Sequence, residues 1–499
     1  MRHVLAVAAA LAVSTSACAG TAKPDTDPKG VVPPISWGPC TDIKRPGGQT
    51  PAQQDPSVRC AKLAVPLDYE NPSGDTIQLA LIKVAATSQK SRLGSLVFNF
   101  GGPGGSGVDT LDQAAKSFDT LRARYDLISF DPRGVERSAG VRCGSDADLD
   151  RWVAINTLPI DERTRLASQA ANREFARLCQ RDSGSVLPYV GTVNAARDMD
   201  RLRTALKEPK LNYFGMSYGT QLGAVYATLY PKNVGRMVLD APLDPAITFG
   251  ERTLAQTSGF QREYETFLKD CVKSGCDFGK TVKAANANVN RLMNRLVTRP
   301  LTVNGRQLTQ GLASTGVAAA LYSELSWPFL EKAIAAGIKG RGEALMFLAD
   351  SYTGRDERGH YSTQMASFPA ITCVDSAERP DDQQLRGTWE KSTRISPLFG
   401  GEGSGGLCRF WPVPGNDQAR HVNATGSAPI VVVGGKGDPA TPYQWAPRLT
   451  AELKTARLMT YEGEGHGAYT SGNRCIQRKV DSYLLTGKLP ARGAVCSAT

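Results

Sequence analysis

Short apolar runs alternate with amphipathic segments along the first half of the chain. Runs of β-branched and aromatic residues predict buried strands, and apolar residues spaced every three or four positions predict helices. Val193–Leu202 has the helical spacing and leads into an apolar run at Leu211. The strands predicted in this half are Ile77–Val84, Leu96–Phe100, Tyr125–Phe130, Leu211–Phe214 and Met237–Leu239. Such alternation predicts an α/β fold with a mostly parallel central sheet and helices on both faces.

The strand pattern stops near Pro245 and resumes at Ile430. Between these points the apolar spacing is helical, as in Leu312–Ile338, with few strand-like runs. We therefore predict that the core is interrupted by a helical insertion. The predicted parts are a leader (1–19), a flexible tether rich in proline, aspartate and lysine (20–36), the first part of the core (37–245), a helical cap (246–406) and the last part of the core (407–499).

Composition and charge exclude several classes of protein. Hydrophobic residues make up 41% of the 499 residues, so the chain is globular rather than disordered. No apolar run approaches the ~20 residues of a transmembrane helix. The formal net charge is +11, but lysine and arginine are scattered and no nucleic-acid motif is present. The charge therefore indicates a solvated basic surface, or alternatively a loose attraction to anionic envelope polymers or lipids.

The stretch Gly215–Gly219, with the sequence Gly-Met-Ser-Tyr-Gly, is a G-x-S-x-G motif. The end of a predicted strand precedes it, and Thr220–Ala227 reads as a helix after it. A serine between such a strand and helix lies on a sharp, strained turn that presents its hydroxyl above the sheet. We therefore predict that Ser217 is a nucleophile; the alternative is an ordinary tight turn.

The chain has only four histidines, so the search for a general base is short. His3 lies in the leader, and His360 and His421 lie in polar stretches. His466 differs because it lies on a glycine-rich loop just after the strand-like run Arg457–Tyr461. A loop at the end of a strand can bring a base to both a nucleophile and an orienting acid.

The orienting acid is predicted to follow another buried strand. The β-branched run of Ile430–Val433 ends in a loop of glycine and proline that contains Asp438. The order Ser217, Asp438, His466 is the order expected of an α/β-hydrolase, which is the fold we predict. Asp240, one strand after the nucleophile, is the rival acid.

Two backbone N–H groups must meet the oxygen that becomes negative during acyl transfer. One is expected from Tyr218, which follows the nucleophile. The other is expected from the glycine-rich loop Gly101–Gly107, with Gly102 as the first choice and Gly101 as the next. A phosphate-binding loop is the alternative, but the Gly-Lys-Ser/Thr ending of a P-loop is missing.

These residues resemble a known family. Phe100–Gly104 and Asp131–Ser138 resemble segments of the proline-iminopeptidase group of α/β-hydrolases, although Phe100 stands where that group usually has histidine. Over about Trp37–Cys496 the chain is similar to the secreted tripeptidyl aminopeptidases of actinobacteria and their mycobacterial cell-envelope relatives. Further matching stretches are Ile371–Asp375, Cys408–Pro414 and Asp438–Tyr443.

The N-terminus has the pattern of an export signal. Arg2 and His3 precede the apolar stretch Val4–Val13, and small residues follow. Ser16-Ala17-Cys18 is similar to a lipoprotein cleavage site, which would leave Cys18 lipidated and the protein anchored to the cell envelope. Ala17-Cys18-Ala19 alternatively fits an A-x-A signal-peptidase site, and the protein would then be secreted.

Either cleavage leaves ten of the eleven cysteines in the folded enzyme. An even number in an exported protein indicates disulfides, whereas no pair shows the C-x-x-C spacing of a zinc site, so we expect no metal. Neighbours in the sequence suggest the pairs Cys40–Cys60, Cys143–Cys179, Cys271–Cys276, Cys373–Cys408 and Cys475–Cys496, although the sequence does not determine the connectivity.

We predict from these features a serine exopeptidase that needs no cofactor and releases short peptides, such as tripeptides, from free N-termini. The substrate ammonium then requires a carboxylate, and Glu324 and Asp375 in the predicted cap are chosen on location alone. The expected partners are peptide or protein N-termini, with no nucleic acid and with membrane contact only through a lipid anchor. An esterase or lipase acting on envelope esters, and a binding protein on a hydrolase scaffold, are the alternatives.

Overall fold

The computed structural model describes residues 32–43, 55–158, 161–401 and 406–498. Within these residues a sheet of nine strands runs in the order β1-β2-β4-β3-β5-β6-β9-β10-β11. β1–β2 and β2–β4 are antiparallel, and all other neighbours are parallel. The strands are β1 (Val58–Pro66), β2 (Thr76–Val84), β3 (Gly94–Asn99), β4 (Tyr125–Phe130), β5 (Leu211–Met216), β6 (Val234–Asp240), β9 (Ile430–Gly437), β10 (Ala456–Glu464) and β11 (Ala494–Ser497).

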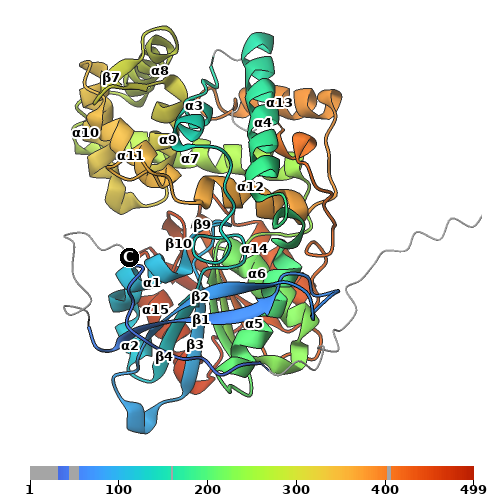
Figure 1. The fold of residues 1–499 in the computed structure, drawn as a ribbon. Coiled ribbons are helices and arrows are strands. Elements are labelled where there is room, and N and C mark those ends of the chain that lie inside the picture. The colour runs from blue at the N-terminus through green and yellow to red at the C-terminus, as the bar shows by residue number, and fades with distance from the viewer. Residues whose placement is uncertain (1–31, 44–54, 159–160, 402–405, 499) are drawn as a thin grey trace, which may run out of the picture.

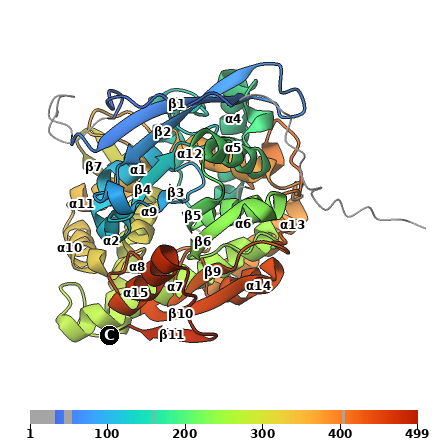
Figure 2. The same cartoon turned by 90° about the horizontal axis from the view of Figure 1, so that it is seen from below.

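Helices cover both faces of this sheet, as an α/β-hydrolase fold requires (Figures 1 and 2). Side chains of a strand alternate between its two faces, so Val97 joins one buried cluster while Leu96 and Phe98 join the other. The first face packs against α5 (Thr192–Ala205), α6 (Tyr218–Leu229) and α14 (Trp445–Leu453). The second packs against α1 (Gly107–Ala114), α2 (Asp119–Arg122) and α15 (Arg474–Thr486).

The chain between β6 and β9 is mainly helical and lies to one side of the sheet (Figure 1). The buried apolar side chains from Tyr264 to Ala349 form a separate cluster, whereas those from Ala366 to Val374 join the cluster on the first face of the sheet. The helices are α7 (Phe249–Ser274), α8 (Val282–Thr298), α9 (Gln310–Ala320), α10 (Trp327–Ile338), α11 (Glu343–Thr353), α12 (Gln364–Val374) and α13 (Asp382–Ile395). α3 (Asp146–Val153) and α4 (Glu162–Ser183), which the sequence division placed in the core, lie beside them in Figure 1.

Three features of the fold differ from the sequence pattern. The strand β1, which pairs with β2 over its whole length, and the short strand β11 were not predicted. The helical insertion contains a two-stranded hairpin, β7 (Leu301–Val303) and β8 (Arg306–Leu308). The helical pattern of Leu312–Ile338 is broken between α9 and α10, where Pro328 stands in the first turn of α10.

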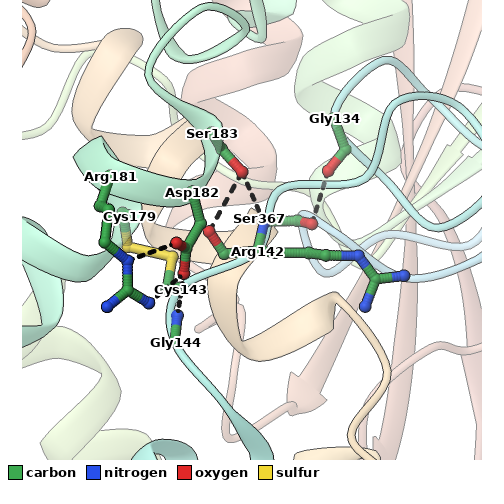
Figure 3. Close-up of a disulfide and its surroundings, with 9 residues drawn as sticks. All are labelled: Gly134, Arg142, Cys143, Gly144, Cys179, Arg181, Asp182, Ser183 and Ser367. Carbon is green, nitrogen blue, oxygen red and sulfur yellow. Dashed lines mark hydrogen bonds and ion pairs between the residues drawn. A yellow bond between two sulfur atoms is a disulfide. The ribbon is translucent and has the colours of Figure 1, made fainter.

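Five disulfides join the same cysteine pairs that the sequence suggested. Figure 3 shows Cys143–Cys179, which links the loop after β4 to α4. Backbone N–H groups of Arg142 and Gly144 donate to Ser183 Oγ (2.8 Å) and Asp182 Oδ2 (2.6 Å) of the same helix. Ser367 Oγ of α12 donates to the carbonyl of Gly134 in this loop (2.6 Å). The loop is therefore held from two sides.

Removing Cys143–Cys179 by a double Cys→Ser substitution is expected to lower the free energy of unfolding by about 3 to 4 kcal/mol, because the bridge closes a long loop in the unfolded chain. Its cysteines are 36 residues apart, whereas Cys271 and Cys276 are 5 apart. The same change at Cys271–Cys276 should therefore cost less, about 2 kcal/mol. Urea unfolding of both variants measures the difference, and a larger loss at the short loop would contradict the expectation.

Candidate active site

Ser217 occupies the turn between β5 and α6 with φ 54° and ψ −124°. This left-handed backbone is strained for a residue with a side chain, and such strain is found at functional sites. The Ser217 N–H donates to the carbonyl of Asp240 at the end of β6 (3.0 Å), which ties the turn to the neighbouring strand. The G-x-S-x-G interpretation therefore matches the local backbone.

The glycines on either side of this turn are required by close backbone contacts. A Cβ at Gly215 would collide with the carbonyl oxygen of Gly219, and a Cβ at Gly219 would collide with the carbonyl oxygen of Asn99. Glycine alone allows the strand, the turn and the neighbouring β3 to approach so closely.

His466 lies two residues beyond β10 and is oriented by Asp438, the residue after β9. His466 Nδ1 lies 2.9 Å from both carboxylate oxygens of Asp438. The Asp438 carboxylate is fully buried, and it also accepts from the N–H groups of Ala440 (2.9 Å) and Thr441 (2.8 Å) and from Thr441 Oγ1 (2.8 Å). These donors aim the carboxylate at the imidazole.

Asp240, the rival acid, holds the histidine loop rather than the imidazole. Its carboxylate accepts from the backbone N–H groups of Ala468 (3.1 Å) and Tyr469 (2.8 Å). Burial raises the pKa of Asp240 to about 6, while these two hydrogen bonds lower it. The geometry therefore favours Asp438 over Asp240 as the partner of His466.

The protonation of His466 is governed by opposing effects. Burial lowers its pKa, but the charge and hydrogen bond of Asp438, together with the charge of Asp240, raise it above the ordinary value of histidine. An imidazole with this environment accepts a proton readily and is stabilised as an imidazolium. These are the properties that a general base beside a serine needs.

The glycine-rich loop after β3 lies directly against the nucleophile turn. A Cβ at Gly101 would be 2.8 Å from Ser217 Cβ and 3.2 Å from Tyr218 N. Gly101 and Gly102 have φ values of 101° and 111°, which side chains disfavour. Tyr218 is the first residue of α6, so its N–H has no carbonyl partner within the helix. The loop and the helix start are thus brought together, as the expected oxyanion site requires.

The inserted helices reach this site at the break between α9 and α10. The carbonyl of Tyr322 accepts the His466 N–H (2.8 Å), and the Tyr322 ring lies edge-on to the imidazole with centroids 5.3 Å apart. From α7, an Arg262 N–H donates to the carbonyl of Asp438 (3.0 Å). The sequence pattern pointed to neither residue, because helical periodicity does not show where a helix is interrupted.

The two acids chosen from the sequence as ammonium ligands lie in different places. Asp375 is buried, and its carboxylate accepts from the N–H of Thr192 (2.7 Å) and from the Thr192 hydroxyl. Burial raises the pKa of Asp375 to about 6. Both of its oxygens have donors at the start of α5, and Asp375 also lines a cavity together with Pro103 and Tyr218, so its role as an ammonium ligand stays a prediction. Glu324 is exposed and lies in the break that carries Tyr322.

The other histidines, and the cysteines considered for metal binding, have no role in this site that the described residues show. His360 is exposed and pairs with Asp146 (2.9 Å), and His421 is exposed as well. Cys271 and Cys276 lie near Glu331, but they form a disulfide and cannot also bind a metal as thiolates. His3 and Cys18 lie outside the described residues, as do the predicted leader and most of the tether. None of the described helices is long and apolar enough to cross a membrane.

Comparisons with known proteins agree with this geometry. The family described as TAP-like protein matches residues 396–496, which include Asp438 and His466. The chain is 37% identical to serine protease Hip1 of Mycobacterium tuberculosis over 93% of the chain and 91% of the relative. It is 35% identical to carboxylesterase B of the same species (94% and 91%) and 32% identical to tripeptidyl aminopeptidase of Streptomyces lividans (88% and 84%).

Proposed function

The chain belongs to the TAP-like family of α/β-hydrolases, together with Hip1 and the Streptomyces tripeptidyl aminopeptidases, and from this premise we propose that it is a serine exopeptidase. It releases short peptides, such as tripeptides, from free N-termini. The observation that carries the proposal is the buried His466–Asp438 pair at the same edge of the parallel sheet as the strained Ser217 turn.

The proposed reaction is acyl transfer in two halves. His466 Nε2 removes the proton of Ser217 Oγ as the oxygen attacks the scissile carbonyl, and the C–N bond breaks when the imidazolium returns that proton to the leaving amine. His466 then activates a water molecule, which releases the peptide and regenerates Ser217. Asp438 holds the tautomer of His466 and stabilises its charged form. The N–H groups of Tyr218 and Gly102 stabilise the oxyanion.

The inserted helices support a preference for chain ends over internal bonds. They contact both loops that carry the base and the acid, through Tyr322 and Arg262. A cap in this position limits access to segments that can enter end first, and the space between Ser217 and the ammonium-binding residues sets the length of the product.

Digestion of peptides of five to eight residues, analysed by mass spectrometry, tests this preference for chain ends. Release of intact tripeptides from the N-terminus supports the proposal, and cleavage at internal sites without end preference contradicts it.

The second candidate function is ester hydrolysis. It is favoured by the 35% identity to a relative named carboxylesterase B, and the same triad serves both reactions. Turnover of short acyl esters without any turnover of free-amine peptides would support it over the peptidase.

Export to the cell envelope or beyond is part of the proposal. Five disulfides among the described residues are typical of an oxidising compartment. The proposed leader ends either before Cys18, which then carries lipid, or after Ala19, which removes Cys18. Fractionation of cells expressing the wild type and Cys18→Ala distinguishes the two routes, because only a lipid anchor makes membrane retention depend on Cys18.

A further inference from the structure

Three glutamates converge between the inserted helices and the loop that carries His466. Glu263 comes from α7, Glu324 from the short 3-10 turn Glu324–Ser326, and Glu464 from the last position of β10. Charge interactions link Glu263 to both of the others and Glu464 to Glu324. We call Glu263, Glu324 and Glu464 the three-glutamate cluster.

Two of these carboxyl groups are buried without the partners that buried charges require. The Glu263 side chain is fully buried, and neither of its oxygens has a hydrogen-bond donor in the described part of the chain. Glu464 Oε2 is buried and likewise has none. Burying a carboxylate without a donor or a cation is costly, so such a group either takes up a proton or is completed by a ligand.

The charges around the cluster also indicate a missing cation. Burial is the main cause that raises the pKa of Glu263 to about 9; the nearby Glu464 adds to this effect, and the charge of Arg262 opposes it. Burial and the charges of Glu464 and Asp270 raise the pKa of Glu324. With a pKa of about 9, Glu263 holds a proton at neutral pH when no cation lies beside it. Arg262 donates to the carbonyl of Asp438, and among the described residues it forms no ion pair with Glu263 or Glu464.

The cluster adjoins the catalytic residues on two sides. Glu464 is two residues before His466, and its carboxylate lies against Gly437, the residue before Asp438, where no Cβ would fit. Glu324 is two residues after Tyr322, whose carbonyl and ring both contact His466. The three side chains differ in exposure: Glu324 is exposed, Glu464 is half-buried and Glu263 is fully buried. A ligand entering the site thus meets Glu324 and Glu464 first.

We propose that the three-glutamate cluster binds the α-ammonium group of the substrate peptide. The ammonium carries three N–H donors, and Glu464 and Glu324 accept hydrogen bonds from it directly. Glu263 lies on the interior side of the Glu464 carboxylate and stabilises its position. This inference rests on the proposed exopeptidase function and names the residues that recognise the free N-terminus. The chemistry required is a compact cation attached to an extended peptide, which distinguishes such substrates from acylated peptides and from esters.

The proposal is tested with Glu464→Gln, Glu324→Gln and the double variant, using a tripeptide anilide with a free amine, its N-acetylated form and a short acyl ester. Loss of a charged hydrogen bond is expected to lower kcat/KM for the free-amine anilide about 100-fold in Glu464→Gln and further in the double variant, mainly through KM. The loss on the ester should be much smaller, because the ester has no ammonium. The preference for the free over the acetylated peptide should therefore collapse.

Glu265→Gln is the matched control, because Glu265 lies on α7 two residues from Glu263, is exposed and bonds to Gln261 instead. It should keep the full preference for the free amine. A wild type that cleaves free and acetylated peptides equally would refute the exopeptidase function itself. A wild type that prefers the free amine, with variants that keep this preference, would overturn only the role of the cluster. An equal loss on peptide and ester would also overturn it, since the glutamates would then merely support the histidine loop.

Discussion

Ser217→Ala is expected to lower kcat/KM for a tripeptide anilide by about a millionfold, to the residual rate that binding and the oxyanion donors alone provide. The reason is that no other described side chain replaces Ser217 Oγ at the turn between β5 and α6, so covalent catalysis is lost entirely. The backbone of the turn should be unaffected, because alanine has the same steric demand at φ 54° as serine. Steady-state kinetics measures the loss.

Ser258→Ala is a suitable control for this prediction. Ser258 is exposed on α7, and its hydroxyl donates to the carbonyl of Leu254 in the same helix (3.0 Å). This variant should keep the wild-type rate, and circular dichroism should show the same fold for both variants. Residual activity of Ser217→Ala within tenfold of the wild type would show that Ser217 is not the nucleophile.

Asp438→Asn is expected to lower kcat by about ten-thousandfold while leaving KM nearly unchanged. The carboxylate contacts His466 Nδ1 with both oxygens (2.9 Å), and an amide at this position favours the wrong tautomer of the imidazole. The charge of Asp438 also raises the pKa of His466. Activity requires neutral His466 and falls as the pH drops through this pKa. Loss of the charge lowers the pKa, so the acidic limb of the kcat/KM profile should move to lower pH.

Asp240→Asn is the informative comparison, because Asp240 is the rival acid and, among the described residues, its carboxylate bonds only to the backbone of the histidine loop. It should cost much less, about a hundredfold at most, since one amide oxygen still accepts an N–H group. A pH–rate profile for both variants separates the two roles. If Asp240→Asn lost as much activity as Asp438→Asn, or if Asp438→Asn left the acidic limb in place, the assignment of Asp438 would be wrong.

The parts of the site that follow strands could be predicted from the sequence. Ser217, Asp438 and His466 each lie just beyond an apolar run with glycine nearby, and parallel strands bring their carboxyl ends to one edge of a sheet. Hydrophobic periodicity and turn chemistry are local signals, so they also indicated β2 to β6, β9 and β10. Similarity to the tripeptidyl aminopeptidase family agreed with the same fold and activity.

The parts that depend on packing between distant segments could not be predicted. Glu263 and Glu464 are 201 positions apart in the chain, and each stands in a pattern typical of an exposed acid, on a helix and at a strand end. Only the folded chain shows that Glu263 is buried against Glu464. Asp375 was chosen on location, and only the folded chain shows that it accepts hydrogen bonds from Thr192 at the start of α5. Tyr322 was hidden in a run of helical periodicity that the structure interrupts.

The central claim is that the protein is a serine peptidase that selects its substrates by their free N-terminus. The most direct test compares hydrolysis of a free-amine tripeptide anilide, its N-acetylated twin and a short acyl ester by the wild type and Ser217→Ala. We predict cleavage of the free-amine anilide, loss of cleavage with the acetylated form and no activity in the variant. Cleavage of the ester alone, or equal cleavage of the free and acetylated anilides, would contradict the claim.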